Sequence, residues 1–297
     1  HATALNTASF GNSVTNSVAN STQIGPSNTE KLSISASGVN FITAGANGFK
    51  VNGVDVGGGG DVNALNPIVV GYSNTATGAD ASSFGSGNSA AGSKGLAVGH
   101  GNIVSVAGSE ALAIGRNNDA TGSRGMALGF ECNSSNSESI AVGYAATCSG
   151  TKGTSVGHYS VCDGQEACSF GRKANAGGSQ ATALGYNARA EATGSIAIGS
   201  SAQSKLSYGC AMGRGSYTNG AGALAIGQSV LAIGTGALAI GKSITNSTVN
   251  SLDIGPANTE KVQISSAGVN FVTGGANGFQ VNGVPVGGGS APAYAIE

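Results

Sequence analysis

The sequence has few of the residues that most soluble domains use on their surfaces. Its 297 residues include no tryptophan and five prolines, and only 9% are charged, where about a quarter is usual. It has no apolar run near the ~18 residues of a membrane-spanning helix. Its formal net charge of −1 offers no overall cationic surface for nucleic acid. The composition therefore predicts no nucleic-acid partner and no membrane insertion of this segment.

Residues with catalytic or metal-binding chemistry are also sparse. The five cysteines show no paired C-x-x-C spacing of a zinc site. His1, His100 and His158 are scattered, and the last two follow a glycine, which favours solvated turn residues. No glycine-rich phosphate loop opens a helix, and no nine-residue calcium repeat is present. We therefore predict no catalytic, cofactor-binding or metal-binding residue, and no cofactor.

Glycine is abundant instead, with 52 residues, and it marks a repeated phrase of apolar, small, apolar, Gly, as in Leu112-Ala113-Ile114-Gly115. This marker glycine stands at positions 71, 85, 99, 115, 129, 143, 157, 171, 185, 199, 213, 227 and 241. Every step is 14 residues except that from Gly99 to Gly115, which is 16. A period this short excludes helical repeats. It predicts a β-solenoid, in which each coil buries its apolar face by stacking on the next coil.

Positions are numbered here by their distance from the marker glycine. Because alternate residues of a strand point to opposite faces, positions −3 and −1 share one face and position −2 lies on the other. Position −1 is always apolar, and position −2 is almost always Ala or Ser. We expect the large −1 residues to fill the roll, although the pattern also allows the reverse assignment. The predicted structural core is Val98, Ile114, Leu128, Val142, Leu184, Ile198, Ile226 and Ile240.

Position −5 alternates in charge over seven successive coils. Its residues are Asp80, Lys94, Glu110, Arg124, Glu138, Lys152 and Glu166. With ~4.8 Å between stacked strands, each charge would lie between two opposite charges. This charge ladder is predicted to fix the stacking register, and scattered solvated charges are the alternative.

Three further patterns predict local structure. Asparagine recurs at +3 in residues 74, 88, 102 and 118, which predicts a ladder of stacked amides. Glycine is frequent at +7, half a period from the marker, so two glycines per coil are expected to supply the two corners, where the backbone needs a positive φ or a close approach. The two extra residues of the long coil, near residues 103–107, predict a bulge or a protruding loop.

Cys148 and Cys162 both stand at +5, in adjacent coils. Their Cα atoms would then be about 5 Å apart, which lies inside the disulfide range. They are a candidate disulfide, and packed reduced thiols are an equal alternative.

Residues 24–59 and 254–289 are two copies of one module, which differ at nine of 36 aligned positions. Asn47-Gly48 and Asn52-Gly53 predict hairpin turns within it. The predicted organisation along the chain is the end of a preceding roll (1–25), a connector (26–60), a linker (61–68), the long roll (69–255), a second connector (256–290) and the start of a further segment (291–297).

The 14-residue phrase resembles the head repeats of trimeric autotransporter adhesins of the YadA type. Ser195-Ile196-Ala197-Ile198-Gly199-Ser200-Ser201-Ala202 is similar to that family's consensus, and the resemblance covers about residues 69–256. It implies an all-β fold, a left-handed parallel β-roll that forms a homotrimer, and a role in adhesion. The chain departs from the family in showing no neck sequence and no heptad stalk.

The resemblance implies a non-enzymatic segment of a trimeric surface fibre, extracellular on a cell surface or virion. Its expected partners are itself and an unidentified host-surface or matrix ligand, and it would also act as a rigid spacer. The alternative is a phage or virus tail or capsid fibre, since residues 51–58 are similar to glycine-rich joints in such fibres. A third alternative, a β-solenoid tailspike enzyme, needs paired carboxylates in a groove, whereas the acids here alternate with cations.

Overall fold

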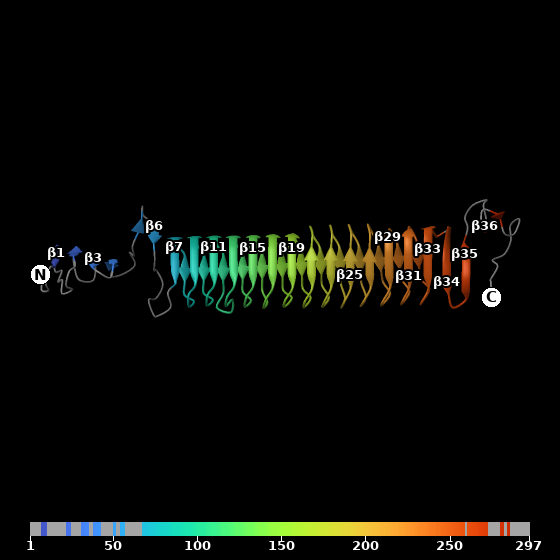
Figure 1. Ribbon diagram of the computed structural model, residues 1–297, viewed down its shortest axis with the longest axis horizontal. Coiled ribbons are helices and arrows are strands. Elements are labelled where there is room, and N and C mark those ends of the chain that lie inside the picture. The colour runs from blue at the N-terminus through green and yellow to red at the C-terminus, as the bar shows by residue number, and fades with distance from the viewer. Residues whose placement is uncertain are drawn as a thin grey trace.

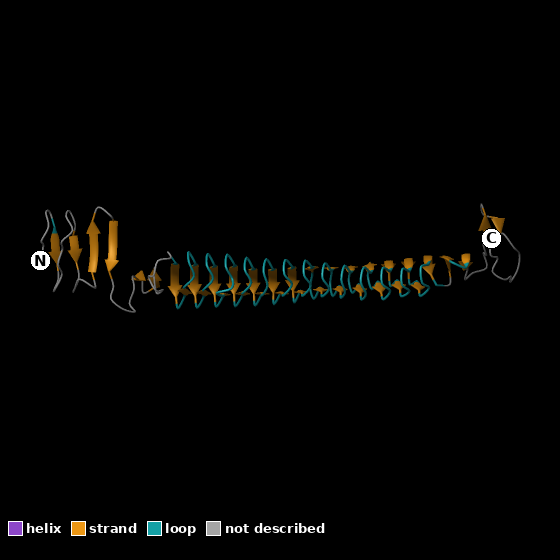
Figure 2. Ribbon diagram, turned by 90° about the horizontal axis from the view of Figure 1, so that it is seen from below, coloured by secondary structure: helices purple, strands orange, loops and turns teal. Residues whose placement is uncertain are grey.

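The computed structural model describes residues 7–10, 22–24, 31–35, 38–42, 50–51, 54–56, 67–258, 260–272, 280–281 and 284–285. These residues form 37 strands and the turns between them. No helix that could cross a membrane occurs in the part of the chain described. Residues 67–258 form a straight stack of coils, which Figure 1 shows from the side with the long axis horizontal. Figure 2, turned by 90°, shows the turns that close each coil on both sides.

Each coil contributes one long strand to one sheet and one short strand to a second sheet. The long strands are β7 (Ile68–Tyr72), β9 (Ser82–Ser86), β11 (Leu96–His100), β13 (Leu112–Arg116), β15 (Met126–Phe130), β17 (Ile140–Tyr144), β19 (Thr154–His158), β21 (Cys168–Phe170), β23 (Thr182–Leu184), β25 (Ile196–Ile198), β27 (Cys210–Met212), β29 (Leu224–Gln228), β31 (Leu238–Lys242) and β33 (Leu252–Ala257). The short strands are β8 (Thr75–Ala76), β10 (Ser89–Ala90), β12 (Ile103–Val104), β14 (Asp119–Ala120), β16 (Asn133–Ser134), β18 (Thr147–Cys148), β20 (Val161–Cys162), β22 (Asn175–Ala176), β24 (Arg189–Ala190), β26 (Gln203–Ser204), β28 (Tyr217–Thr218), β30 (Leu231–Ala232) and β32 (Thr245–Asn246).

All of these strands pair in parallel with the strand one coil away. Val98 pairs with Ile114, and Gly99 pairs with Gly115, so the marker glycines stack on one another. The predicted β-solenoid of 14-residue coils is therefore confirmed. The 16-residue coil keeps the same register, because Ile103 pairs with Asp119. Its extra residues leave the stack after β12, where the side chain of Val106 is 82% exposed, so the predicted protruding loop is confirmed.

Antiparallel strands adjoin the stack at both ends. After β33 come β34 (Glu260–Ser265) and β35 (Gly268–Val272), and Ile254 pairs with Val262. Before the stack, β5 (Lys50–Val51) pairs with β6 (Val54–Val56), which pairs with β7. The remaining strands are β1 (Ala8–Phe10), β2 (Thr22–Ile24), β3 (Lys31–Ser35), β4 (Gly38–Ile42), β36 (Gln280–Val281) and β37 (Val284–Pro285).

The described strands of the two module copies pair in the same way. β2, β3 and β4 form an antiparallel series in which Ile24 pairs with Leu32, the equivalent of Ile254 with Val262. β1 precedes β2 as a parallel strand, and Phe10 pairs with Ile24, 14 residues later. The predicted boundaries of the rolls, connectors and linker remain predictions, and most of residues 1–66 and 286–297 lie outside the described residues.

The interior of the roll is filled by small side chains. Position −2 is fully buried along the stack, as in Ala97, Ala141 and Ala197, and position +5 is equally buried in Ala90 and Cys162. Most inward side chains of the two sheets are Ala, Ser or Cys, and Val104, Val230 and Ile244 are the largest that are fully buried. The roll is therefore thin, and its interior removes little apolar area from water for each residue.

The expectation that the large −1 residues fill this interior is wrong. The −1 side chains lie on the outer face of the long-strand sheet, where Ile114 is 37% and Leu184 is 45% exposed. None of the residues predicted as core is buried in the single chain, namely Val98, Ile114, Leu128, Val142, Leu184, Ile198, Ile226 and Ile240. The physical reason is the narrow spacing of the two sheets, which only the small −2 face fits.

The two glycines of each coil serve the two purposes expected of them, one at each position. The marker glycines have φ between +117° and +142°, but the +7 glycines do not have positive φ. A Cβ on Gly92 or Gly164 would overlap the backbone of the next coil, so glycine at +7 permits close approach. The left-handed corners lie at +2 and −5 instead, as in Tyr159 and Arg124, which both have φ of 54°. Stacking holds these non-glycine residues in a conformation that costs each about 1–2 kcal/mol.

Candidate interaction surfaces

The outer face of the long-strand sheet carries a continuous apolar stripe, formed by positions −3 and −1 of β7 to β33. Its polar members are Ser82, Thr154 and Thr182, and it contains no charged residue. The stripe is about 60 Å long at ~4.8 Å per coil, and its side chains are half-buried or exposed. A contiguous apolar surface that runs the whole length of the roll is unusual on a monomer and marks an interaction surface.

A buried asparagine ladder supports the turn that follows the marker glycine. The Nδ2 atoms of Asn88, Asn102 and Asn118 each donate to the Oδ1 atom of the asparagine one coil earlier, at 2.9–3.0 Å. Their backbone N–H groups donate to the same oxygen atoms at 3.0 Å. The predicted ladder of stacked amides is therefore confirmed. Because each amide also contacts a marker-glycine carbonyl at 2.7–2.8 Å, the ladder satisfies polar groups that the corner would leave unpaired.

Cys132 takes the next place in this ladder. Its backbone N–H donates to Asn118 Oδ1 at 2.9 Å, and its Sγ lies 3.1 Å from the carbonyl oxygen of Gly143. Burial raises the pKa of the Cys132 thiol. Cys132 is therefore a packed, protonated thiol that ends the amide series.

Cys148 and Cys162 pair in register on adjacent short strands and point into the roll, but both are free thiols. Their side chains project in parallel, so the Cβ atoms are separated by roughly the strand spacing of ~4.8 Å. A disulfide needs about 3.8 Å. The hydrogen bond with Cys148, together with burial, raises the pKa of the Cys162 thiol. The structure thus has the reduced alternative, not the candidate disulfide.

The charge ladder lies along one left-handed corner. Arg124 Nη1 is 2.9 Å from Glu138 Oε1, and Arg124 Nε is 3.4 Å from Glu110 Oε2. Lys94 Nζ is 3.7 Å from Glu110 Oε1. All seven members have positive φ: Asp80, Lys94, Glu110, Arg124, Glu138, Lys152 and Glu166. The side chains are exposed, so each pair is worth only about 0.2–1 kcal/mol.

Reversing the charge of Arg124 tests this ladder. Arg124→Glu places three acids in a row and should lower stability slightly at low salt, with recovery at high salt because exposed charges are screened. Adding Glu138→Arg gives the new glutamate at position 124 one opposite neighbour again, so part of the loss should be restored. The recovery should be incomplete, because the new arginine at position 138 faces Lys152. Thermal unfolding of the single and double variants at two salt concentrations measures the coupling. If the effects of the two substitutions on stability are additive, the alternation of charge has no energetic role.

A second ladder, which the sequence analysis missed, occupies position +1. The rings of Phe130 and Tyr144 stack at 5.0 Å, and those of Tyr144 and His158 stack at 4.8 Å. The Arg116 guanidinium lies 5.4 Å from the Phe130 ring centroid, and Tyr159 packs edge-on against His158 at 4.4 Å. His158 is thus part of an aromatic stack, and the interpretation as a solvated turn residue is incomplete. Comparing the +1 residues of successive coils would have revealed this series.

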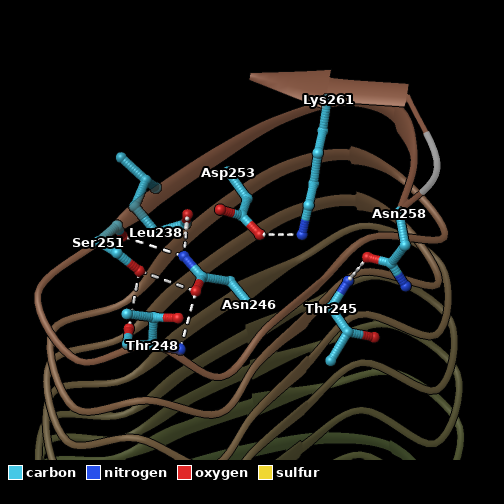
Figure 3. Close-up of polar contacts among 8 residues, drawn as sticks. All are labelled: Leu238, Thr245, Asn246, Thr248, Ser251, Asp253, Asn258 and Lys261. Carbon is cyan, nitrogen blue, oxygen red and sulfur yellow. Dashed lines mark hydrogen bonds and ion pairs between the residues drawn. The ribbon is translucent and has the colours of Figure 1, made fainter. Parts of the chain in front are cut away.

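The last coil is closed by polar contacts, shown in Figure 3. Asp253 stands at −2, where other coils have Ala or Ser, and its carboxylate is 2.6 Å from Lys261 Nζ of β34. Both side chains are nearly buried, at 1% and 12% exposure. Beneath this pair, Asn246 Nδ2 donates a hydrogen bond to the carbonyl oxygen of Ser251, and Ser251 Oγ donates one to Asn246 Oδ1. Since β34 runs antiparallel and covers the final coil, this ion pair caps the parallel stack.

Comparison with known families identifies the repeat. The YadA head domain repeat model matches the chain twice, over residues 107–131 and 176–202. The first match includes β13 to β15, and the second includes β23 to β25. No curated protein matches the chain. Across the described residues, no three His, Cys, Asp or Glu side chains gather where they could hold a metal ion.

Proposed function

Because the roll is a β-solenoid of the YadA head type, we propose that the chain is a segment of a non-enzymatic, homotrimeric surface fibre. It attaches a cell to a host-surface or matrix ligand and extends the attachment point as a rigid spacer. The YadA head is an adhesin module, which supports the adhesive role. The straight stack of in-register coils supports the spacer role, since each coil contacts its neighbours over two sheets.

One observation carries the oligomeric part of this proposal. The apolar stripe is half-buried or exposed on the single chain, although it holds most of the large aliphatic side chains of the roll. Its members include Leu96, Ile140, Ile196, Leu224 and Leu238. A thin roll filled by alanine buries little apolar area of its own, so burial of the stripe against other copies would stabilise it further. Three copies that turn their stripes toward a common axis bury it and leave the short-strand sheets outside.

The mass of the purified chain in solution tests the proposal. At micromolar concentration, light scattering should give three times the 28.4 kDa of one chain. A fluorescent dye that reports exposed apolar surface should not bind the assembled chain. A stable monomer, or a dimer, would contradict the proposed homotrimer.

The adhesive role needs a separate measurement. Bacteria or beads displaying the trimeric chain should attach to host cells or matrix more strongly than undecorated ones. Equal attachment by both would leave only the spacer role.

A further inference from the structure

The net charge near −1 hides an asymmetry between the two halves of the roll. Residues 67–166 contain four cations and seven acids, whereas residues 167–250 contain six cations and one acid. The six cations are Arg172, Lys173, Arg189, Lys205, Arg214 and Lys242, and all are exposed. They span five coil steps, or about 24 Å along the rod. The C-terminal half of the roll is therefore strongly basic.

These cations, called here the basic face, occupy only part of the coil. They stand at positions +1 and +2, at the corner where the long strand ends, and at +4 and +6, on the short strand or directly after it. The apolar stripe, at −3 and −1, lies on the long-strand sheet across the roll. Burial of the stripe in a trimer would therefore leave the basic face on the outside, repeated three times.

Most cations of the basic face have no acidic partner in the C-terminal half of the roll. The single acid, Glu191, pairs with Arg189 at 3.1 Å. Arg172 lies 5.5 Å from the Tyr186 ring centroid, and Lys205 lies 5.5 Å from that of Tyr217. Cation–π contacts orient these side chains without neutralising their charge.

A shallow pocket lies at one end of the basic face. It is about 180 Å³ in volume, and its lining includes Tyr159, Lys173, Asn175, Asn187 and Arg189. Ammonium, guanidinium and amide groups supply N–H donors, and the phenol adds a hydroxyl. This set suits a carboxylate or sulfate flanked by hydroxyl groups, with Arg189 available for a two-point contact once it turns from Glu191.

We propose that the basic face binds a linear acidic polysaccharide, which lies along the rod with one anionic group in the pocket. The inference rests on the proposed adhesive function and names its ligand class. Charges repeated along a rod match anions repeated along an extended chain. Each exposed ion pair is weak, so affinity arises from several contacts made by one chain.

The test uses the 297-residue chain and heparin oligosaccharides, with hyaluronan oligosaccharides and neutral dextran in parallel. Binding is measured by calorimetry near physiological salt. Heparin or hyaluronan should bind and dextran should not; heparin alone identifies sulfate as the group recognised, whereas both binding identifies carboxylate as sufficient. Raising the salt concentration should weaken binding, because exposed charges are screened.

A triple variant, Lys173→Gln, Arg189→Gln and Lys205→Gln, removes three charges from the basic face. It should bind the oligosaccharide at least about tenfold more weakly, equivalent to about 1.4 kcal/mol. Its mass and melting temperature should match those of the unaltered chain, because all three side chains are exposed.

The matched control, Lys94→Gln, Arg116→Gln and Lys152→Gln, removes three charges from the acidic half and should change affinity less than about twofold. Equal loss in both variants, no binding by the unaltered chain, or tighter binding of duplex DNA than of heparin would overturn the inference. If the chain is trimeric and adhesive but does not bind the polysaccharide, this inference is wrong and the proposed function still stands. A monomeric chain would instead refute the proposed function.

Discussion

Ile198→Asp is expected to convert the proposed trimer into folded monomers, whereas Ala197→Asp should prevent the roll from folding. The two residues are adjacent on β25 but point to opposite faces. Ala197 is fully buried between the sheets. An unpaired charge there costs about 3–5 kcal/mol in each chain. Ile198 lies on the apolar stripe, so its aspartate stays hydrated in a monomer and is desolvated only in the assembly.

Circular dichroism and light scattering separate these outcomes. Ile198→Asp should keep the β-sheet spectrum and lose the trimer mass, whereas Ala197→Asp should lose both. Ile198→Val, which removes one methylene, is the control and should keep the trimer with a modest loss of stability. Were Ile198→Asp to remain trimeric, the stripe would not be the interface.

Gly227→Ala should give the second large effect. Gly227 has φ of +125°, where a residue with a side chain is strained. An added Cβ would also overlap the carbonyl oxygen of Gly241 in the next coil. Since that oxygen belongs to stacked backbone, the coils must separate to admit the methyl group. We expect a loss of about 2–4 kcal/mol per chain.

Gly177→Ala is the matched control for this change. Gly177 is exposed and has no positive φ, and the nearest atom to an added Cβ is the Asn175 side-chain oxygen at 3.3 Å. Alanine there should be neutral or should stabilise by about 0.4–1 kcal/mol, because it restricts the unfolded chain. Chemical denaturation of both variants gives the comparison. Similar stabilities would mean that the marker glycines are not needed for close stacking.

The spacing of the marker glycines was sufficient to predict the coil, its parallel register and the asparagine ladder. It was insufficient to decide which strand face lies inside. Alternation separates Ile198 from Ala197, but the gap between the two sheets determines which of them fits within it. That gap depends on the facing short strand, whose inward residues such as Ala190 and Ser204 are fully buried, and it is not encoded in any single strand.

Of the interactions on the surface of the roll, the sequence predicted the charge ladder but not the aromatic stack or the ion pair at the last coil. The charge series at −5 was evident because opposite signs alternate, and Glu110, Arg124 and Glu138 lie within ion-pair distance. The stack of Phe130, Tyr144 and His158 mixes residue types, so composition alone gave no signal. The pair of Asp253 and Lys261 depends on an antiparallel strand that folds back over the last coil, and residue spacing does not reveal such a fold-back.

The loop after β12 shows where this architecture can vary. Two additional residues leave the stack there, yet Leu96 still pairs with Leu112 and Ile103 with Asp119. Insertion at this corner is absorbed locally, because each coil contacts only its neighbours. An insertion at this corner can therefore change the surface of the fibre in the course of evolution, while the paired strands that would carry mechanical force along the rod stay unchanged.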